Sequence, residues 1–327
     1  FCAALTSYDG GMTVEQLLND GWQFCKLPLG STLEDVSNAA LQAVDLPHDF
    51  LIENENDLYE TTDAWYIRAL DVPESWCASC VLVRFDGVYM DCDVLLNGHI
   101  VCTHHYGYTA FDVDLTSRLL VGRNTLAVHI RHQSPNSRWY SGAGIYRDVT
   151  LHVLPKRHIP LDGVYVTTTH ELESWTMTID TELCGVKDNG VLTHVLLDGD
   201  VPVCDVTVEA AGDHANAVMQ VLSPKLWSPD APNVYTLQTM LGNQVIRQNV
   251  GFRDLTFTTD RGLLVNGAPV KLHGVCLHHD LGCLGSAFHE KAMRRQLRAM
   301  RQMGVNALRT SHNPPAKQVM DLCDELG

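Results

Sequence analysis

The sequence has 327 residues, of which 45% are hydrophobic and 19% charged; this is typical of globular proteins and long enough for two or three domains. With 23 basic and 39 acidic residues, the formal net charge is −16. Such an acidic surface repels phosphate backbones, so we expect no nucleic-acid partner. We find no secretory leader and no apolar run of about eighteen residues, so we also expect no membrane partner.

Eleven cysteines are scattered along the chain. The most closely spaced pair, Cys77 and Cys80, forms a single C-x-x-C in a predicted loop before a strand, whereas a thioredoxin-type motif precedes a helix. We therefore interpret the cysteines as reduced and mostly buried thiols of a cytoplasmic protein.

Residues 1–256 have the pattern of β structure. Apolar and polar residues alternate in four short segments, which gives each strand one buried and one polar face: 81–85, 126–130, 149–153 and 175–179. Asn97-Gly98, between two apolar runs, predicts a β-hairpin. Many short strands separated by turns are typical of β-sandwiches. The segment 154–160 contains two prolines and a basic cluster, and it predicts a boundary between two such domains.

The pattern changes after residue 256. Asn266-Gly267 predicts another hairpin, and an apolar strand follows it. Met293, Leu297 and Met300 have helical spacing, and Gly304 is a natural helix end. A second strand and a second helix come next, with Asn313 as the expected N-cap of that helix. Strand, helix, strand and helix with short connections predict a parallel βαβ unit.

Polar side chains follow both predicted strands: His278, His279 and Asp280 after the first, and Arg309, Ser311, His312 and Asn313 after the second. In a βα barrel the carboxyl ends of the strands form the catalytic face, so we expect these residues at one rim. A single histidine is more often a surface or hydrogen-bonded polar residue, but two clusters at matching strand ends favour a site.

Two other kinds of site are weaker interpretations. Adjacent residues of a strand point to opposite faces, so His278 and His279 cannot easily bind one zinc ion. A catalytic triad using Ser311 lacks the G-x-S-x-G turn that presents such a nucleophile. We therefore predict no metal site among these residues.

The stretch "NALRTSHNPP" (306–315) resembles a signature of glycoside hydrolase family 2, which contains β-galactosidases, β-glucuronidases and β-mannosidases. Further stretches agree with that family in order and spacing: 18–24, 45–50, 137–151, 226–237 and 274–280. The resemblance implies a mainly β chain in three parts. These are a jelly-roll sugar-binding sandwich (1–156), an immunoglobulin-like sandwich (157–256), and the first two βα units of a (β/α)₈ barrel (257–327).

The resemblance also implies roles for the candidate residues. Arg309 and His312 would orient the sugar and the catalytic carboxylates, and His278, with His279, Asp280 and Asn313, would line the same rim. From the jelly-roll, the loop carrying Arg138, Trp139 and Tyr140 would reach over the barrel mouth. Some relatives have an aspartate near Arg138 that contacts the sugar or a cation, so a cation site is not carried over to this chain.

The family's retaining mechanism needs two carboxylates about 5–5.5 Å apart. Glu290 and Glu325 fall on predicted helices, and we interpret them as solvated surface residues. No catalytic residue is therefore expected within the chain, and both glutamates are expected beyond Gly327. The complete protein would be a glycosidase of β-galactosidase type acting on a carbohydrate, and the 327-residue chain would be inactive.

The sequence says less about the cofactor and the oligomeric state. We expect no cofactor in this chain, while the resemblance leaves open a divalent cation in the complete enzyme and a homo-oligomeric state. The alternative function is a non-catalytic module that binds sugar on exposed aromatic rings, with Trp65, Trp76 and Trp139 as candidates, or that serves oligomer assembly.

Overall fold

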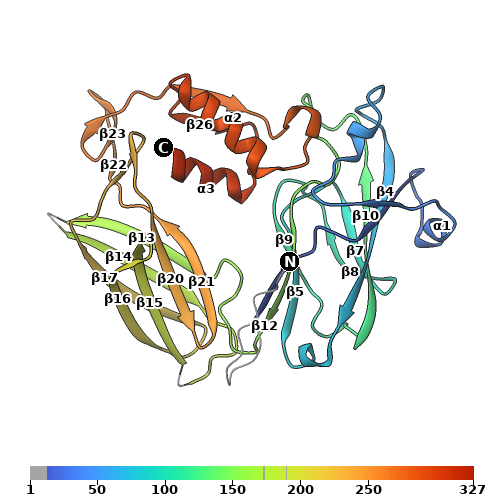
Figure 1. Cartoon of the computed structure of the whole chain (residues 1–327), viewed down its shortest axis with the longest axis horizontal. Coiled ribbons are helices and arrows are strands. Elements are labelled where there is room, and N and C mark those ends of the chain that lie inside the picture. Colours follow the sequence, from blue (N-terminus) through green and yellow to red (C-terminus); the bar gives the residue numbers. More distant parts are fainter. Residues whose placement is uncertain (1–12, 172–173, 189) are drawn as a thin grey trace.

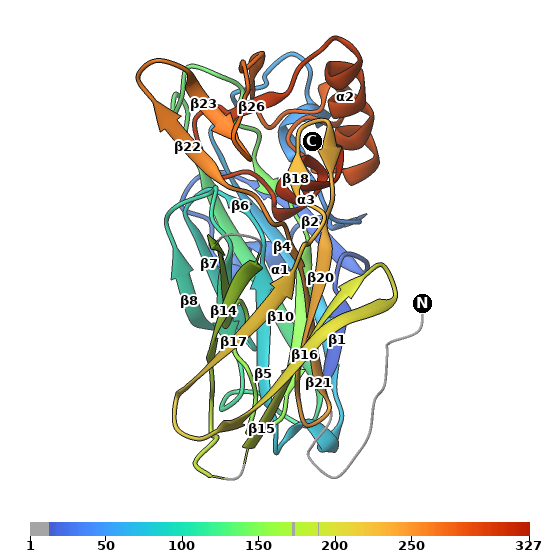
Figure 2. The same cartoon turned by 90° about the vertical axis from the view of Figure 1, so that its left-hand side faces the viewer.

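Two β-sandwiches stand side by side, and a short α/β segment lies across the same end of both (Figure 1). Figure 2, turned by 90°, shows the same segment at one end of the sandwiches. This computed structural model describes residues 13–171, 174–188 and 190–327. No α-helix in those ranges has the length and hydrophobicity that crossing a membrane would require.

The first sandwich packs a four-stranded sheet against a six-stranded sheet. The smaller sheet has the order β1 (Val14–Leu17), β12 (Val149–Leu154), β5 (Cys80–Phe85) and β9 (Phe111–Asp114). The larger has the order β3 (Gln42–Val44), β2 (Trp22–Leu27), β4 (Thr62–Val72), β10 (Gly122–His132), β7 (Cys92–Leu96) and β8 (His99–His104). Alternate side chains of both sheets meet in one core around the fully buried Trp22, Tyr66 and Phe85.

Smaller elements complete this sandwich. Helix α1 (Leu33–Ser37) covers the outer face of the larger sheet, and β6 (Val88–Tyr89) pairs with β11 (Gly144–Ile145). The predicted Asn97-Gly98 turn joins β7 to β8. Both residues have positive φ, 51° and 82°, which is the backbone that a tight two-residue hairpin requires.

The second sandwich has the seven main strands expected of an immunoglobulin-like fold. One sheet has the order β13 (Val164–Glu171), β14 (Ser174–Glu182) and β17 (His214–Leu222). The other has the order β16 (Val201–Ala210), β15 (Gly190–Asp198), β20 (Tyr235–Leu241) and β21 (Gln244–Val250). A short ribbon of β18 (Trp227–Ser228) and β19 (Ala231–Pro232) faces the α/β segment. The prediction of two successive β-sandwiches is confirmed.

The α/β segment begins with an antiparallel sheet of β22 (Leu255–Thr258), β23 (Gly262–Val265) and β24 (Ala268–Pro269). Strands β25 (Gly274–Leu277) and β26 (Ala307–Thr310) are parallel. Helix α2 (Glu290–Gln302) connects them, and α3 (Lys317–Leu326) follows. The βαβ prediction is therefore confirmed.

The predicted N-cap of the second helix was wrong. Helix α3 begins at Lys317 with Ala316 in the N-cap position, so Asn313 does not cap it. Asn313 is followed by Pro314 and Pro315, and Pro315 disfavours the helical conformation of Pro314, so the helix cannot begin directly after Asn313. The chain therefore stays extended for three more residues, and Asn313 belongs to the loop at the strand end.

The α/β segment is bonded to both sandwiches. On the jelly-roll side, the Phe288 amide donates to the Tyr146 carbonyl over 2.9 Å, and the Gln318 amide to Asp148 over 3.0 Å. On the other side, Trp227 Nε1 donates to the Asp324 carbonyl over 2.8 Å. These contacts hold the strand ends of the α/β segment in a fixed position over the jelly-roll.

Acid should destabilise the second sandwich through His194. This side chain is 0% exposed, and burial lowers its pKa to about 4. Between pH 6.5 and about 4 the unfolded chain therefore binds a proton that the folded chain does not, so stability falls as the pH falls through that window. We expect His194 to contribute about 3 kcal/mol of this loss. Urea unfolding across this range should show a smaller loss for His194→Val than for the natural chain, while exposed His99→Gln should leave the loss unchanged. Parallel curves for His194→Val and the natural chain would contradict the prediction.

Candidate functional site

The two parallel strands have one packed face and one open face. Leu277 and Leu308 point toward α2 and α3 and contribute to the small core there. Because side chains alternate along a strand, the opposed residues Cys276 and Arg309 point the other way and are exposed. On this open face Arg309 Nη1 donates to Ser311 Oγ over 2.9 Å and lies 3.9 Å from Cys276 Sγ. Hydrogen bonding to the Cys276 thiol, with the larger effect from Ser311 and the smaller from Arg309, lowers its pKa.

Three rings meet at the carboxyl end of this face. The ring centroids of His278 and His312 are 5.7 Å apart. The Trp139 ring lies 5.7 Å from His278 and 5.2 Å from His312, and Trp139 Nε1 donates to the hydroxyl of Tyr108 over 3.3 Å. The structure thus brings two residues from the strand ends together with one from the jelly-roll loop, as the sequence predicted.

His279 points to the other side, as strand alternation predicts. Its Nε2 lies 2.8 Å from the Ser141 carbonyl; since a carbonyl only accepts, Nε2 carries the hydrogen. The rings of Tyr108 and Tyr146 lie beside it, 5.4 and 5.8 Å between centroids. Burial lowers the pKa of His279, which favours the neutral ring. His279 therefore joins the strand end to the jelly-roll and does not face the open side.

Asp49 connects the jelly-roll to the loop that follows β25. The carboxylate is 1% exposed and accepts five hydrogen bonds. Oδ2 accepts from the Tyr140 hydroxyl (2.7 Å) and from the amide and hydroxyl of Ser286 (2.8 and 3.0 Å). Oδ1 accepts from the amides of Leu51 and Ala143 (3.1 and 3.0 Å). Tyr140, predicted to contact sugar, thus has its hydroxyl engaged with Asp49, and burial followed by the Asp49 charge raises its pKa.

A close approach of two loops makes this network possible. Gly142 has a φ of 66°, and a Cβ atom there would lie 2.0 Å from Ser286 Oγ. Gly285, in the opposing loop, has a φ of 58°, and its Cβ would lie 2.4 Å from Asp49 Oδ2. Neither position can carry a side chain without displacing the network.

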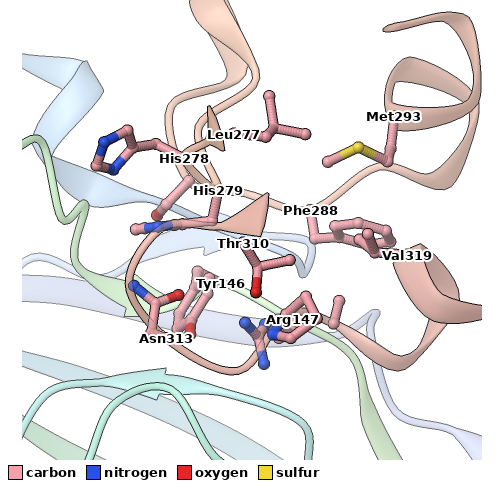
Figure 3. Close-up of a pocket in the computed structure, with 13 residues that line it drawn as sticks. Tyr146, Arg147, Leu277, His278, His279, Phe288, Met293, Thr310, Asn313 and Val319 are labelled. Atoms are coloured by element: carbon pink, nitrogen blue, oxygen red, sulfur yellow. The ribbon is translucent and has the colours of Figure 1, made fainter. Parts of the chain in front are cut away.

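Arg147 occupies the rest of this interface (Figure 3). It is 4% exposed and donates to three carbonyls, those of Asp86 (3.3 Å), Tyr108 (3.1 Å) and Pro314 (2.9 Å). The cavity beside it, which Asn313 and His279 also line, has a volume of only about 20 Å³. That is room for about one water molecule.

The sequence did not single out Asp49, Ser286, Arg147 or Tyr108. Asp49 and Arg147 fall within stretches 45–50 and 137–151, which carry the family resemblance. That resemblance was a usable signal, but nothing in the local pattern indicated that these two residues bridge domains.

Other acidic and aromatic candidates lie outside the site. Glu290 and Glu325 are both paired with Arg294 on the outer surface of the helices, as the sequence interpretation expected. Trp65 is 3% exposed and stacked on His129, and Trp76 is 8% exposed in the jelly-roll core. These two rings therefore cannot be exposed sugar platforms, and that part of the alternative was wrong. Trp139 is half-buried beside His278 and His312, at the strand ends that form the mouth of the site.

The charged groups at the mouth do not resemble a divalent metal site. Within the described ranges no three His, Cys, Asp or Glu side chains are grouped as ligands. Asp280 is half-buried, and its charge contributes, after burial and Asp49, to the raised pKa of Tyr140. Partial desolvation and then nearby positive charges lower the pKa of His312; these charges belong to Arg309, His278 and Arg138. Divalent cations favour carboxylates, and the donors here do not fit one.

Models of one protein family match the chain in three consecutive regions. Glycosyl hydrolases family 2, sugar binding domain, matches residues 12–155; the central model, Glycosyl hydrolases family 2, matches 158–253; and the TIM barrel domain of the same family matches 257–327. The chain belongs to glycoside hydrolase family 2. The chain is 34% identical over 321 residues to a family 2 β-galactosidase of Bacteroides ovatus, covering 88% of this chain and 37% of that protein.

Other relatives also have glycosidase or family 2 names. A β-glucuronidase of Bacteroides fragilis is 28% identical, with 95% of this chain and 48% of that protein covered. Among solved structures, a family 2 member from Bacteroides cellulosilyticus superposes with a TM-score of 0.88 at 30% identity, covering 96% of this chain and 46% of that one. A Bacteroides uniformis β-glucuronidase gives 0.84 at 29%, covering 96% and 41%. The chain thus spans less than half the length of these relatives.

Removing the Asp49 carboxylate should release the barrel loop from the jelly-roll. Asp49→Ala leaves five donors without their acceptor in a buried site, so we expect the free energy of unfolding to fall by about 3–5 kcal/mol. Urea unfolding measures this change. Asp20, whose carboxylate forms a surface ion pair with Arg68, is the control, and Asp20→Ala should cost less than about 1 kcal/mol. Equal losses in the two variants would refute a special role for Asp49.

Proposed function

We propose that the protein carrying this chain is a retaining glycosidase that cleaves terminal β-glycosidic bonds. One observation supports this most strongly: His278, His312 and Trp139 gather at the carboxyl rim of β25 and β26, beside the open face that carries Arg309. The relatives named β-galactosidase and β-glucuronidase support the same reaction class.

In this proposal the chain supplies the binding half of the site. The sugar lies at the carboxyl ends of the two strands, where Trp139 packs against its apolar side. A neutral imidazole has one donor and one acceptor nitrogen, so it can pair with a sugar hydroxyl in either sense. The lowered pKa of His312 favours this neutral form. Arg309 supplies a fixed cation that orients carboxylates.

Catalysis needs a nucleophile and an acid/base about 5–5.5 Å apart. Glu290 and Glu325 are paired with Arg294 on the outer surface and cannot reach the open face. We propose that both catalytic glutamates belong to later strands of the barrel, beyond Gly327.

The test is hydrolysis of aryl β-galactoside, β-glucoside, β-glucuronide and β-mannoside. A polypeptide that extends this sequence through a complete barrel should cleave at least one of them. His312→Ala should lower its kcat/KM by about 100-fold, which corresponds to about 2.7 kcal/mol of transition-state stabilisation. His289, the exposed N-cap residue of α2 whose side chain forms no capping hydrogen bond, is the control, and His289→Ala should leave kcat/KM unchanged. The 327-residue chain should give no turnover above a heat-killed sample; turnover would place catalytic carboxylates within it and contradict the proposal.

We also propose a cytoplasmic location. The ten cysteines in the described ranges are all free thiols, which is usual in a reducing compartment. Only Cys25 and Cys92 among them are buried, so the expectation of mostly buried thiols was wrong. Alkylation of the thiols in freshly lysed cells, followed by mass spectrometry, tests this: recovery of disulfide-linked peptides would argue for an oxidising compartment.

A further inference from the structure

The indole of Trp139 reaches the mouth of the site from a segment without regular structure. Residues 133–143 form neither helix nor strand, so no ladder of backbone hydrogen bonds fixes the side chain from below. Its ring nevertheless lies against both histidines of the mouth, with centroids 5.7 Å from His278 and 5.2 Å from His312. A tryptophan side chain has several staggered rotamers. The contacts that hold the indole therefore decide whether it faces the site.

The indole nitrogen makes a polar contact inside the jelly-roll. Nε1 of Trp139 donates to the Tyr108 hydroxyl over 3.3 Å, and Tyr108 is only 7% exposed. Burial raises the pKa of Tyr108, so the phenol is neutral near pH 7. Its oxygen can then accept the indole hydrogen and still donate its own.

Tyr108 is itself fixed by the interface between the jelly-roll and the α/β segment. Arg147 donates to its carbonyl over 3.1 Å, and the Tyr146 hydroxyl donates to the carbonyl of the preceding Gly107 over 2.7 Å. The Tyr108 ring packs edge-to-face with that of His279, with 5.4 Å between centroids. The interface thus sets the position of the Tyr108 hydroxyl, rather than the loop that carries the indole.

We propose that Tyr108 is a positioning residue of the site: its hydroxyl holds the Trp139 indole against His278 and His312, in the orientation that packs against the sugar. The inference rests on the proposed glycosidase function. Tyr108 is too deeply buried to touch the substrate and acts through Trp139. A ring that is already ordered spares the complex the entropy of ordering it, which should improve the affinity for the sugar about fivefold.

Tyr108→Phe tests this, because it removes the hydroxyl and keeps the ring that packs against His279. In proton–nitrogen correlation spectra of the 327-residue chain, the indole signal that Trp139→Phe removes is that of Trp139. We expect Tyr108→Phe to shift this signal upfield, as the loss of a hydrogen bond does. The matched control is Tyr235→Phe in the second sandwich. Tyr235 is 4% exposed and its hydroxyl accepts from the Lys225 amide over 2.8 Å, so its loss should leave the Trp139 signal in place. An unmoved Trp139 signal in Tyr108→Phe would overturn the proposal.

Kinetics of the polypeptide with a complete barrel test the consequence for substrate, with the aryl β-glycoside that it cleaves best. We expect Tyr108→Phe to raise KM about fivefold and to change kcat by less than about twofold, because the indole contacts the sugar alike in the ground and transition states. Tyr235→Phe should leave both constants unchanged. Trp139→Phe lacks the Nε1 donor, so adding Tyr108→Phe to it should raise KM no further.

The outcomes separate the two proposals. An unchanged KM in Tyr108→Phe, or a further rise in KM when it is added to Trp139→Phe, would overturn the role of Tyr108 and leave the glycosidase proposal standing. If none of the aryl glycosides is cleaved, the glycosidase proposal fails, and the positioning role fails with it even where the indole signal moves.

Discussion

The arrangement of the site depends on one buried carboxylate. Asp49 accepts five hydrogen bonds from three segments that are far apart in sequence: its own turn, the loop of Tyr140 and Ala143, and the barrel loop at Ser286. A buried charge is stable only when its lone pairs are satisfied. The three segments can therefore satisfy Asp49 only in one relative position, and that position brings Trp139 to the ends of β25 and β26.

Around this carboxylate, the interface is built from backbone groups as much as from side chains. Arg147 is buried without an ion pair among the described residues and donates to three carbonyls, and His279 donates to the Ser141 carbonyl. Carbonyl acceptors have fixed positions once the loops are folded, so these bonds restrict the geometry more than flexible ion pairs would. Gly142 and Gly285 let the loops approach to that distance. A jelly-roll loop thereby becomes part of the barrel mouth.

The mouth itself combines two chemical characters. Its wall is aromatic and its charged groups are mostly cationic, although the chain as a whole is strongly acidic. The lowered pKa of His312 favours the neutral ring, which can both donate and accept hydrogen bonds near neutral pH.

Local pattern was enough to determine the elements of this protein. Two-residue alternation indicated the sandwich strands, Asn97-Gly98 the hairpin, and the spacing of Met293, Leu297 and Met300 the first helix, because each depends on neighbours within a few residues. The strand-end histidines and the loop at Trp139 also followed from sequence and resemblance. Only the tertiary structure showed that His279 and Tyr140 serve the interface, that Trp65 is buried, and that Asn313 does not cap a helix. Those outcomes depend on which residues from distant segments meet, and above all on the donors that surround Asp49, which no local pattern records.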